Sequence, residues 1–172
     1  MKLMLVGRPG VGKTTVARAV MEALGRRAGG FWTGEIREGG ERRGFCLVTA
    51  AGDSSIMAHV AWAGRMPRVG RYGVDVGVVD RLAVSALRSA VSDPEVECVV
   101  VDEIGRMELL SPAFRRAVES CFRSPKAAVA TAREGADPFV DELMRSEGVE
   151  VLRVTSSSRQ RMAAEVLRRL GG

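Results

Sequence analysis

Two short segments of the chain contain residue types that suit phosphate chemistry. The first, Gly7-Arg8-Pro9-Gly10-Val11-Gly12-Lys13-Thr14, has the pattern G-x-x-x-x-G-K-[ST] at every fixed position. Its glycines allow successive main-chain N–H groups to converge on one anion, at a place where a helix N-terminus adds a favourable field. Lys13 supplies a positive charge for the β- and γ-phosphates, and the Thr14 hydroxyl is suited to ligate Mg²⁺. A chance match in a glycine-rich turn is disfavoured, because a predicted strand precedes the segment and a predicted helix follows it.

The second segment, Val99-Val100-Val101-Asp102-Glu103, is an apolar strand that ends in two acids. This is the Walker-B arrangement, in which Asp102 would complete the Mg²⁺ coordination begun by Thr14. Glu103 is suited to polarise a water molecule against the γ-phosphate. Two adjacent acids after a strand are common, but a P-loop earlier in the same chain favours this interpretation.

The elements that must position these residues follow from hydrophobic periodicity. Buried strands are predicted at 2–6, 96–101, 127–132 and 149–154, and helices at 13–24, 79–91, 112–122, 138–146 and after Ser157 or Ser158. Short apolar strands that alternate with helices indicate an α/β fold, a mostly parallel sheet with helices on both faces. Residues 31–37 and 44–50, around Glu38-Gly39-Gly40-Glu41, predict one inserted β-hairpin. We read 56–62 as a strand, 65–73 as a loop, and 1–172 as a single domain.

Composition excludes several classes of protein. The chain has 172 residues, 46% of them apolar and 27% charged, which is typical of a globular domain. The first apolar run is too short for a signal peptide, and none approaches the roughly 18 residues that span a bilayer. Three cysteines without a CxxC pair argue against a disulfide scaffold or a zinc site. We therefore expect a cytoplasmic protein with no membrane partner.

The cations are arginine-rich, and they are scattered. The formal net charge is +5, from 26 Lys and Arg against 21 Asp and Glu, and only Lys2, Lys13 and Lys126 are lysines. A basic balance suits phosphate-bearing partners. Because the arginines are interspersed with carboxylates and aromatic residues are few, nucleic acid is not an expected partner.

The chain resembles the cancer-related (archaeal-type, thermophilic) nucleoside-triphosphatase family over nearly its whole length. The resemblance is most specific in Asp102-Glu103-Ile104-Gly105-Arg106-Met107-Glu108-Leu109, since the P-loop, Gly7 to Thr15, is shared by a whole superfamily. Further matching blocks lie at 30–37, 43–45 and 69–75 and at Val154-Thr155 with Arg159. It implies a RecA-like P-loop NTPase fold that hydrolyses ATP, GTP and other nucleoside triphosphates with Mg²⁺. Arg106 stands where lysine is usual, which bears on rate rather than reaction type, and Trp32 stands where tyrosine is usual.

Three residues are assigned to catalysis, Glu103, Lys13 and Arg106, and two to the metal, Thr14 and Asp102. The residues expected to bind the nucleotide are Gly7, Arg8, Pro9, Gly10, Val11, Gly12, Lys13, Thr14, Thr15, Val99, Val100, Val101, Asp102, Glu103, Ile104, Gly105, Arg106 and Arg159. Arg106 is either an arginine finger supplied in cis or a surface ion pair with Glu108 or a neighbour. Arg159 either stacks on the base, with little selectivity, or is a surface arginine.

The weaker candidates have structural alternatives. Glu108 orients water or Arg106, or is a solvated carboxylate at a helix start, which we favour. Thr131 senses the γ-phosphate or simply ends a strand. Glu35, Arg37 and Arg43 close over the nucleotide or form a cross-strand ion pair. We read His59 as structural, Arg115-Arg116 and Arg168-Arg169 as solvated helix faces, and the cysteines as buried hydrophobes.

The function expected is a Mg²⁺-dependent nucleoside-triphosphate phosphatase with little base selectivity. One alternative is a small-molecule or nucleotide kinase, in which the arginines of 65–71 would belong to a lid that excludes water. The other is an NTP-driven, nucleic-acid-associated protein. The sequence fixes neither the physiological triphosphate nor the oligomeric state.

Overall fold

The computed structural model of the chain describes residues 1–133, 135 and 137–171. Its strands are β1 (Lys2–Val6), β2 (Ala28–Glu38), β3 (Glu41–Thr49), β4 (Ser54–His59), β5 (Arg68–Val69), β6 (Tyr72–Val74), β7 (Cys98–Ile104), β8 (Ala127–Ala132) and β9 (Val149–Arg153). Its helices are α1 (Lys13–Leu24), α2 (Val76–Val78), α3 (Ser85–Ser92), α4 (Pro112–Arg123), α5 (Pro138–Arg145) and α6 (Arg159–Leu170). Shorter turns are η1 (Gly25–Arg27), η2 (Val60–Trp62), the π-helical η3 (Val79–Val84) and η4 (Glu108–Leu110).

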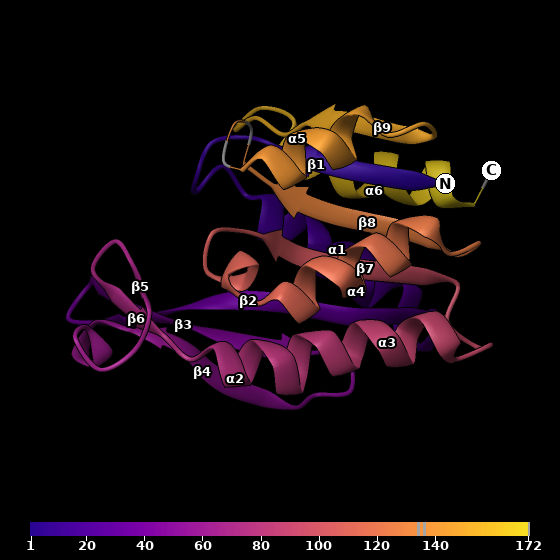
Figure 1. The fold of residues 1–172 in the computed structure, drawn as a ribbon. Helices are drawn as coiled ribbons and strands as arrows, with labels where there is room; N and C mark the ends of the chain where they lie inside the picture. The colour runs from indigo at the N-terminus through magenta and orange to yellow at the C-terminus, as the bar shows by residue number, and fades with distance from the viewer. Residues whose placement is uncertain (134, 136, 172) are drawn as a thin grey trace.

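The fold is α/β, as predicted, and one mixed β-sheet runs through the molecule in the order β5-β6-β4-β3-β2-β7-β8-β1-β9. The half from β2 to β9 is parallel, as predicted, with β1 between β8 and β9. Its strands point to one edge of the sheet, on the left in Figure 1. Because carboxyl ends of parallel strands meet at that edge, the loops after β1, β7 and β8 are brought together there.

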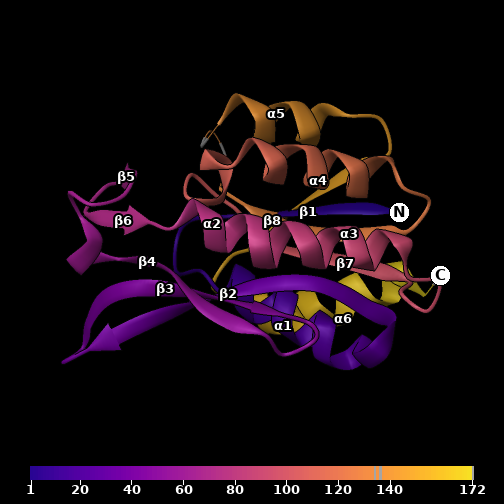
Figure 2. The same ribbon diagram turned by 60° about the horizontal axis from the view of Figure 1, so that its bottom comes forward.

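Helices cover both faces of the parallel half (Figure 2), α1 and α6 on one side and α3, α4 and α5 on the other. Alternate residues of β1 supply the two cores: Leu3 and Leu5 pack in the cluster of α1 and α6, and Met4 and Val6 in the other. A strand buried on both faces reads as a continuous apolar run rather than as an alternation. This is why strand 2–6 was visible in the sequence.

The start of α4 is built as the sequence predicts. Ser111 is its N-cap and accepts a hydrogen bond from the Phe114 N–H at 3.0 Å, and Pro112 lies in the first turn. Phe114 is fully buried and makes an edge contact with Phe31 of β2, with ring centroids 5.8 Å apart. The cap therefore helps to fix α4 against β2, the strand whose Thr33 N–H bonds Asp102.

The antiparallel part of the sheet is larger than the single hairpin that we expected. We call residues 34–74 the wing; its outer part, the turn between β2 and β3 together with β5 and β6, projects beyond the carboxyl ends of the parallel strands (Figure 1). The end of β3 runs back beside β2, where Thr49 pairs with Phe31. The predicted hairpin is present, with positive φ at both Gly39 and Gly40, as a two-residue turn requires. The expected strand 56–62 is instead β4 followed by the turn η2. The expected loop 65–73 contains β5 and the start of β6; these strands pair with each other, and β6 also pairs with β4.

All three lysines donate to main-chain carbonyl groups. Lys2 Nζ bonds the carbonyls of Cys121 (2.9 Å), Ser124 (2.8 Å) and Lys126, at the end of α4. Lys126 Nζ bonds those of Val96 (2.6 Å) and Asp93, beyond the end of α3. Helix C-termini expose unpaired carbonyls and a partial negative charge. A compact ammonium fits such a cluster of carbonyls better than a planar guanidinium, which explains lysine at these positions in an arginine-rich chain.

Candidate active site

The P-loop connects β1 to α1 in the strand–turn–helix context that the motif requires. Lys13 is 5% exposed, and its Nζ lies 3.1 Å from the Gly7 carbonyl and 3.4 Å from that of Arg8. Gly10 and Gly12 have φ of 76° and 107°, a region that favours glycine. The loop thus curls around its own lysine and brings the ammonium group to the start of the helix.

The N-terminus of α1 is open to an anion. Its first turn contains no acid, and in the described part of the chain no side chain caps it. The first N–H groups of a helix lack internal partners and carry a partial positive charge. An uncapped helix start beside a buried lysine therefore favours a bound phosphate group.

Asp102 is buried at the end of β7 and connects four segments. Its Oδ1 accepts hydrogen bonds from the hydroxyls of Thr14 (3.2 Å) and Thr131 (2.5 Å), and its Oδ2 from the Thr33 N–H (3.3 Å). Asp102 and Thr131 are both 0% exposed. The contact with Thr14 brings the two predicted metal ligands together. The contribution of Thr33 was missed, because a main-chain N–H has no signature in the sequence.

Burial raises the pKa of Asp102 to about 6, and the negative charge of Glu103 adds to this effect, while the Thr131 hydroxyl opposes it. Among the described residues no basic side chain forms an ion pair with Asp102. A buried carboxylate flanked by a hydroxyl is a ligand set that Mg²⁺ prefers, and the cation would offset the desolvation of the carboxylate. Thr14 and Asp102 therefore fit the metal expected from the sequence.

Four residues assigned to nucleotide binding lie inside the core instead. Val99, Val100, Val101 and Ile104 are all 0% exposed. Their apolar side chains pack in the two cores on either face of the sheet, so their role is to place Asp102 and Glu103 at its carboxyl end. The register between β7 and β8 shifts between Val101 and Ile104, at the two acids. The P-loop residues Arg8, Pro9, Gly10 and Thr15 are exposed.

In the segment after β7 the structure contradicts the expectation for Glu108 and excludes one of the two ion-pair partners considered for Arg106. Glu108 is not a solvated carboxylate: it is 4% exposed, and burial raises the pKa of its carboxyl group to about 8. Arg106 is exposed, and it forms no ion pair with Glu108. Its positive charge contributes to the lowered pKa of Asp137, after the larger effect of the Arg115 hydrogen bonds. Glu103 is half-buried beside Gly105.

Arg159 lies at the P-loop. A methyl group placed on Gly12 would be 3.1 Å from Arg159 Cδ, so the aliphatic part of this arginine packs over the loop. Gly7, at the start of the loop, also has no room for a side chain, because an added Cβ would be 2.6 Å from the Val154 carbonyl oxygen. The segment after β9 therefore packs against the P-loop, and Arg159, which is exposed, lies beside it.

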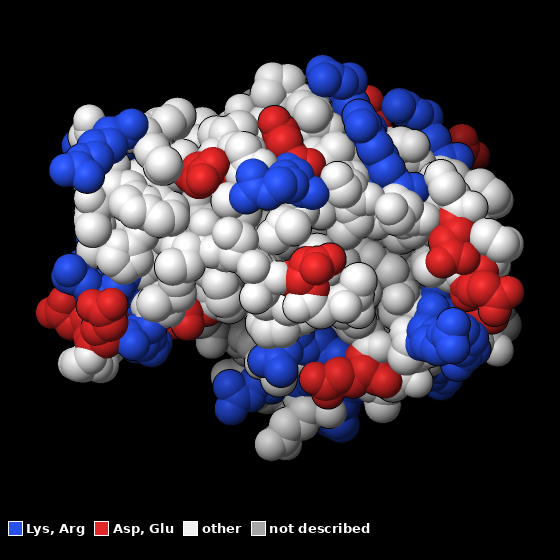
Figure 3. All heavy atoms as spheres, turned by 90° about the horizontal axis from the view of Figure 1, so that it is seen from below, with Lys and Arg blue, Asp and Glu red and all other residues white. Residues whose placement is uncertain are grey.

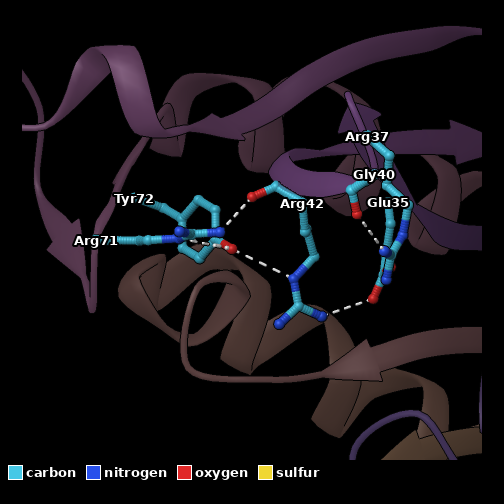
Figure 4. A network of polar contacts seen from close by, with 6 residues as sticks. All are labelled: Glu35, Arg37, Gly40, Arg42, Arg71 and Tyr72. Carbon is cyan, nitrogen blue, oxygen red and sulfur yellow. Dashed lines mark hydrogen bonds and ion pairs between the residues drawn. The ribbon is translucent and has the colours of Figure 1, made fainter.

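Three arginines of the wing, Arg37, Arg42 and Arg71, bond to groups of the wing itself (Figure 4). Glu35 pairs with Arg37 (2.7 Å) and Arg42 (2.6 Å), and these contacts oppose its burial and lower its pKa. Arg43, the third charged residue that we singled out on the hairpin, pairs with Glu38 at 3.5 Å.

The Tyr72 hydroxyl accepts from Arg42 Nε (3.2 Å) and Arg71 Nε (3.3 Å), and Arg71 also donates to the Arg42 carbonyl at 2.5 Å. Arg68 donates to the Gly70 carbonyl at 3.2 Å. Glu35 thus forms the cross-strand ion pair that was one of its two expected roles. Arg68 and Arg71, of the expected lid segment, are hydrogen-bonded to other groups of the wing.

Several remaining residues have structural contacts. His59 Nδ1 accepts from the Ala61 N–H at 3.2 Å and caps η2, as a structural histidine would. Arg115 is not simply solvated, since it forms a bidentate pair with Asp137 at 3.2 and 3.3 Å. Arg169 likewise bridges Glu165 and Glu150. Cys98 and Cys121 are buried, whereas Cys46 is half-buried.

A cavity of about 820 Å³ lies outside this site, between the last turn of α1 and the helix η3–α3. Its lining includes Met21, Gly29, Trp32, Leu82 and Ala86, and it contains none of Lys13, Asp102 or Glu103.

The face in Figure 3 has basic and acidic side chains interspersed around broad uncharged areas. None of the helices in the described residues is both long and apolar enough to cross a membrane.

Comparisons with known proteins agree with the geometry. The family model described as "NTPase" matches residues 2–167. Nucleoside-triphosphatase THEP1 of Thermotoga petrophila is 40% identical over 170 residues, which cover 97% of this chain and 91% of that protein. THEP1 of Methanothermobacter thermautotrophicus is 39% identical over 175 residues, 99% of this chain and 97% of that protein.

Two solved structures have the same fold. The crystal structure of THEP1 from Aquifex aeolicus has a TM-score of 0.88 at 36% identity, covering 99% of each chain. The solution structure of a human cancer-related nucleoside triphosphatase has a TM-score of 0.82 at 35% identity, covering 98% of this chain and 96% of that one. The chain belongs to the NTPase family, the family of these nucleoside-triphosphatases.

Proposed function

We propose that this protein is a Mg²⁺-dependent phosphatase of nucleoside triphosphates, which hydrolyses ATP, GTP and other triphosphates to the diphosphate and phosphate. The observation that carries the proposal is the 3.2 Å contact between the Thr14 hydroxyl and Asp102, because it joins a P-loop to an acid at the end of β7. A P-loop supplies the phosphate grip, and the acid supplies the second half of a cation site.

In this proposal the main-chain N–H groups from Gly10 to Thr14 hold the β-phosphate. Lys13 leaves its contacts with the Gly7 and Arg8 carbonyls, at 3.1 and 3.4 Å, and bridges the β- and γ-phosphates. Because Lys13 is already held at the loop, little side-chain freedom is lost when the nucleotide binds. Catalysis then depends on positioning and on neutralisation of charge rather than on a covalent intermediate.

Thr14 and Asp102 are the residues that would hold Mg²⁺, with Thr131 and Thr33 keeping the Asp102 carboxylate oriented. When bound, the cation neutralises charge on the phosphate oxygens. The Thr131 hydroxyl, at 2.5 Å from Asp102, acts as an orienting group for that carboxylate.

Glu103 acts as the general base. It accepts a proton from a water molecule whose oxygen attacks the γ-phosphorus, while the bond from that phosphorus to the β–γ bridging oxygen breaks. Arg106 is exposed and forms no ion pair with Glu108, so its guanidinium is available to the charge that develops on the γ-phosphoryl group. Arg159 packs over Gly12 and stacks on the base. Because every base has a π-face, stacking gives little base selectivity.

The kinase alternative has less support. A kinase needs a lid that excludes water from the acceptor. Arg68 and Arg71, which belong to the segment considered for that lid, donate to groups of the wing itself, at Gly70, Tyr72 and Arg42. A nucleic-acid-associated protein would need a basic stripe, whereas the face in Figure 3 has mixed charges.

A phosphate-release assay tests the proposal. Purified protein is given ATP, GTP, CTP or UTP, with Mg²⁺ or with a chelator, and without an acceptor. We expect release from all four with Mg²⁺, values of kcat/KM within about tenfold of one another, and no release with the chelator. Turnover that requires an added nucleoside monophosphate would identify a kinase. Turnover that requires RNA or DNA would identify an NTP-driven, nucleic-acid-associated protein.

Two further expectations are part of the proposal. The whole chain, 1–172, acts as a single domain, because the site draws on β1, β2, β7 and β8 and on the segment after β9. The cytoplasm is its location, since the free thiols of Cys98 and Cys121 suit a reducing compartment.

A further inference from the structure

Glu108 is a buried acid that the proposed mechanism does not use. It begins η4 and is 4% exposed, and in the described part of the chain it forms no ion pair with a basic side chain. The turn that carries it is closed on itself, since the Leu109 N–H donates to the Gly105 carbonyl at 2.9 Å. Burying a carboxyl group is unfavourable unless it is protonated or well hydrogen-bonded. A buried acid whose pKa responds to the charges of Asp102 and Glu103 therefore needs an explanation.

Gly105 brings Glu108 and Glu103 together. A methyl group placed at Gly105 would lie 2.7 Å from Glu108 Oε2 and 3.8 Å from Glu103 Cγ. The carboxyl group of Glu108 thus occupies the space that any other residue at 105 would fill, and it lies on the same side of the chain as the Glu103 side chain. Because both atoms lie close to this one point, the two side chains are neighbours, and a rotation about the side-chain bonds of Glu103 can bring its carboxylate to the Glu108 carboxyl group.

The protonation of Glu108 suits such a contact. Burial, together with the negative charges of Glu103 and Asp102, raises the pKa of Glu108 to about 8, while the Glu108 and Gly105 N–H groups oppose this effect. At neutral pH the side chain is a carboxylic acid, which has one O–H donor. An acid that is kept neutral in an active site is able to donate a hydrogen bond to a charged neighbour.

We propose that Glu108 is a positioning residue for Glu103: it donates a hydrogen bond from its carboxyl O–H to the Glu103 carboxylate and holds that carboxylate toward the attacking water. This inference rests on the proposed function, in which Glu103 is the general base. It assigns to Glu108 no contact with the nucleotide.

The alternative is that Glu108 only fills space beneath the turn. Two variants separate the two roles: E108Q keeps the shape and a hydrogen-bond donor, and E108M keeps the approximate volume without a donor. Each is made in the wild-type chain and in the E103Q chain. The readouts are kcat and KM for ATP, with nucleotide binding and thermal unfolding as checks on the fold.

We expect E103Q alone to lower kcat by about 100-fold. In the wild-type chain we expect E108M to lower kcat about tenfold with KM within about twofold, and E108Q to stay within about threefold. In the E103Q chain E108M should have no further effect, because a residue that acts only through Glu103 has nothing left to position.

The inference is overturned if E108M lowers kcat equally in both chains, if E108Q is as damaging as E108M, or if E108M has no effect on the wild-type kcat. Full turnover of E103Q would instead overturn the proposed role of Glu103, on which the inference rests. If E108M does not fold, G105A replaces it, because its methyl group would displace the Glu108 carboxyl. The same loss, confined to the chain with Glu103, is then expected.

Discussion

Two buried acids of the parallel half differ from the acids of the wing hairpin in how their charge is compensated. In the wing Glu35 pairs with Arg37 and Arg42, and Glu38 pairs with Arg43. In the parallel half Asp102 and Glu108 are buried, and in the described residues neither is paired with a cation. Paired acids stabilise structure, whereas buried and unpaired acids are unfavourable unless a ligand or a proton compensates them. The contrast supports the proposal that the chemistry takes place in the parallel half, and it is consistent with a structural role for the polar network of the wing.

The largest effect is expected where the phosphate grip is removed. K13A leaves the P-loop without its ammonium group, and we expect kcat/KM for ATP to fall by about 1000-fold or more. R116A is the matched control, because Arg116 is an exposed cation on α4, and it should stay within about twofold. Equal activity of K13A and R116A would remove the P-loop from the account.

The next largest effect is a pH dependence of stability, which a buried unpaired acid should cause and a paired acid should not. Burial raises the pKa of Glu108 to about 8, so the folded chain retains a proton that the unfolded chain has already lost at pH 6. The contribution of Glu108 to stability is therefore complete at low pH and is lost as pH rises through 8. Without ligand, the free energy of unfolding should fall between pH 6 and 8, by up to about 1.4 kcal/mol for each pH unit.

E108Q, which does not titrate, should remove most of this decline, as measured by urea unfolding at each pH. E35Q is the control, because the contacts with Arg42 and Arg37 lower the pKa of Glu35, which is already ionised in that range. A decline that is as steep in E108Q as in the wild type would show that Glu108 does not hold the proton.

A smaller effect tests how far the site extends toward β9. R159A removes the side chain that packs over Gly12, and we expect KM to rise about tenfold for ATP, GTP, CTP and UTP alike, with kcat nearly unchanged. R161A, an exposed arginine on the same helix, is the control. An increase confined to one base would mean that Arg159 reads the base rather than stacks on it.

The smallest effect on turnover is expected in the wing. Y72F leaves Arg42 and Arg71 without the hydroxyl that accepts from both, and it should lower the free energy of unfolding by about 1 kcal/mol. Thermal unfolding measures the loss, and kcat should remain within about twofold of the wild type. A tenfold loss of kcat in Y72F would make the wing part of the active site.

The sequence predicted the parallel half well and the wing poorly, for a physical reason. Strands buried on both faces, such as 2–6, are continuous apolar runs, and the P-loop has fixed spacing. The strands β5 and β6 have two and three residues, too few for an alternation to be visible. Their positions depend on tertiary pairing, of β6 with β4 and of β5 with β6, which no local pattern encodes.

The candidate site was predicted to the extent that its groups are side chains in a motif. The contact of Thr14 with Asp102 followed from the motif chemistry, whereas the Thr33 N–H did not, since any residue provides one. The burial of Glu108 was mispredicted, because a carboxylate near a helix start is normally solvated. Its burial depends on Gly105, whose missing side chain leaves room for the carboxyl group.

The most direct test is a crystal structure with Mg²⁺ and a non-hydrolysable triphosphate analogue. We predict the β-phosphate within the loop Gly7–Thr14, Lys13 on the β- and γ-phosphate oxygens, and the cation beside Thr14 and Asp102. An analogue bound elsewhere, for example in the cavity between α1 and α3, with the loop empty and Asp102 distant from the cation, would contradict the account.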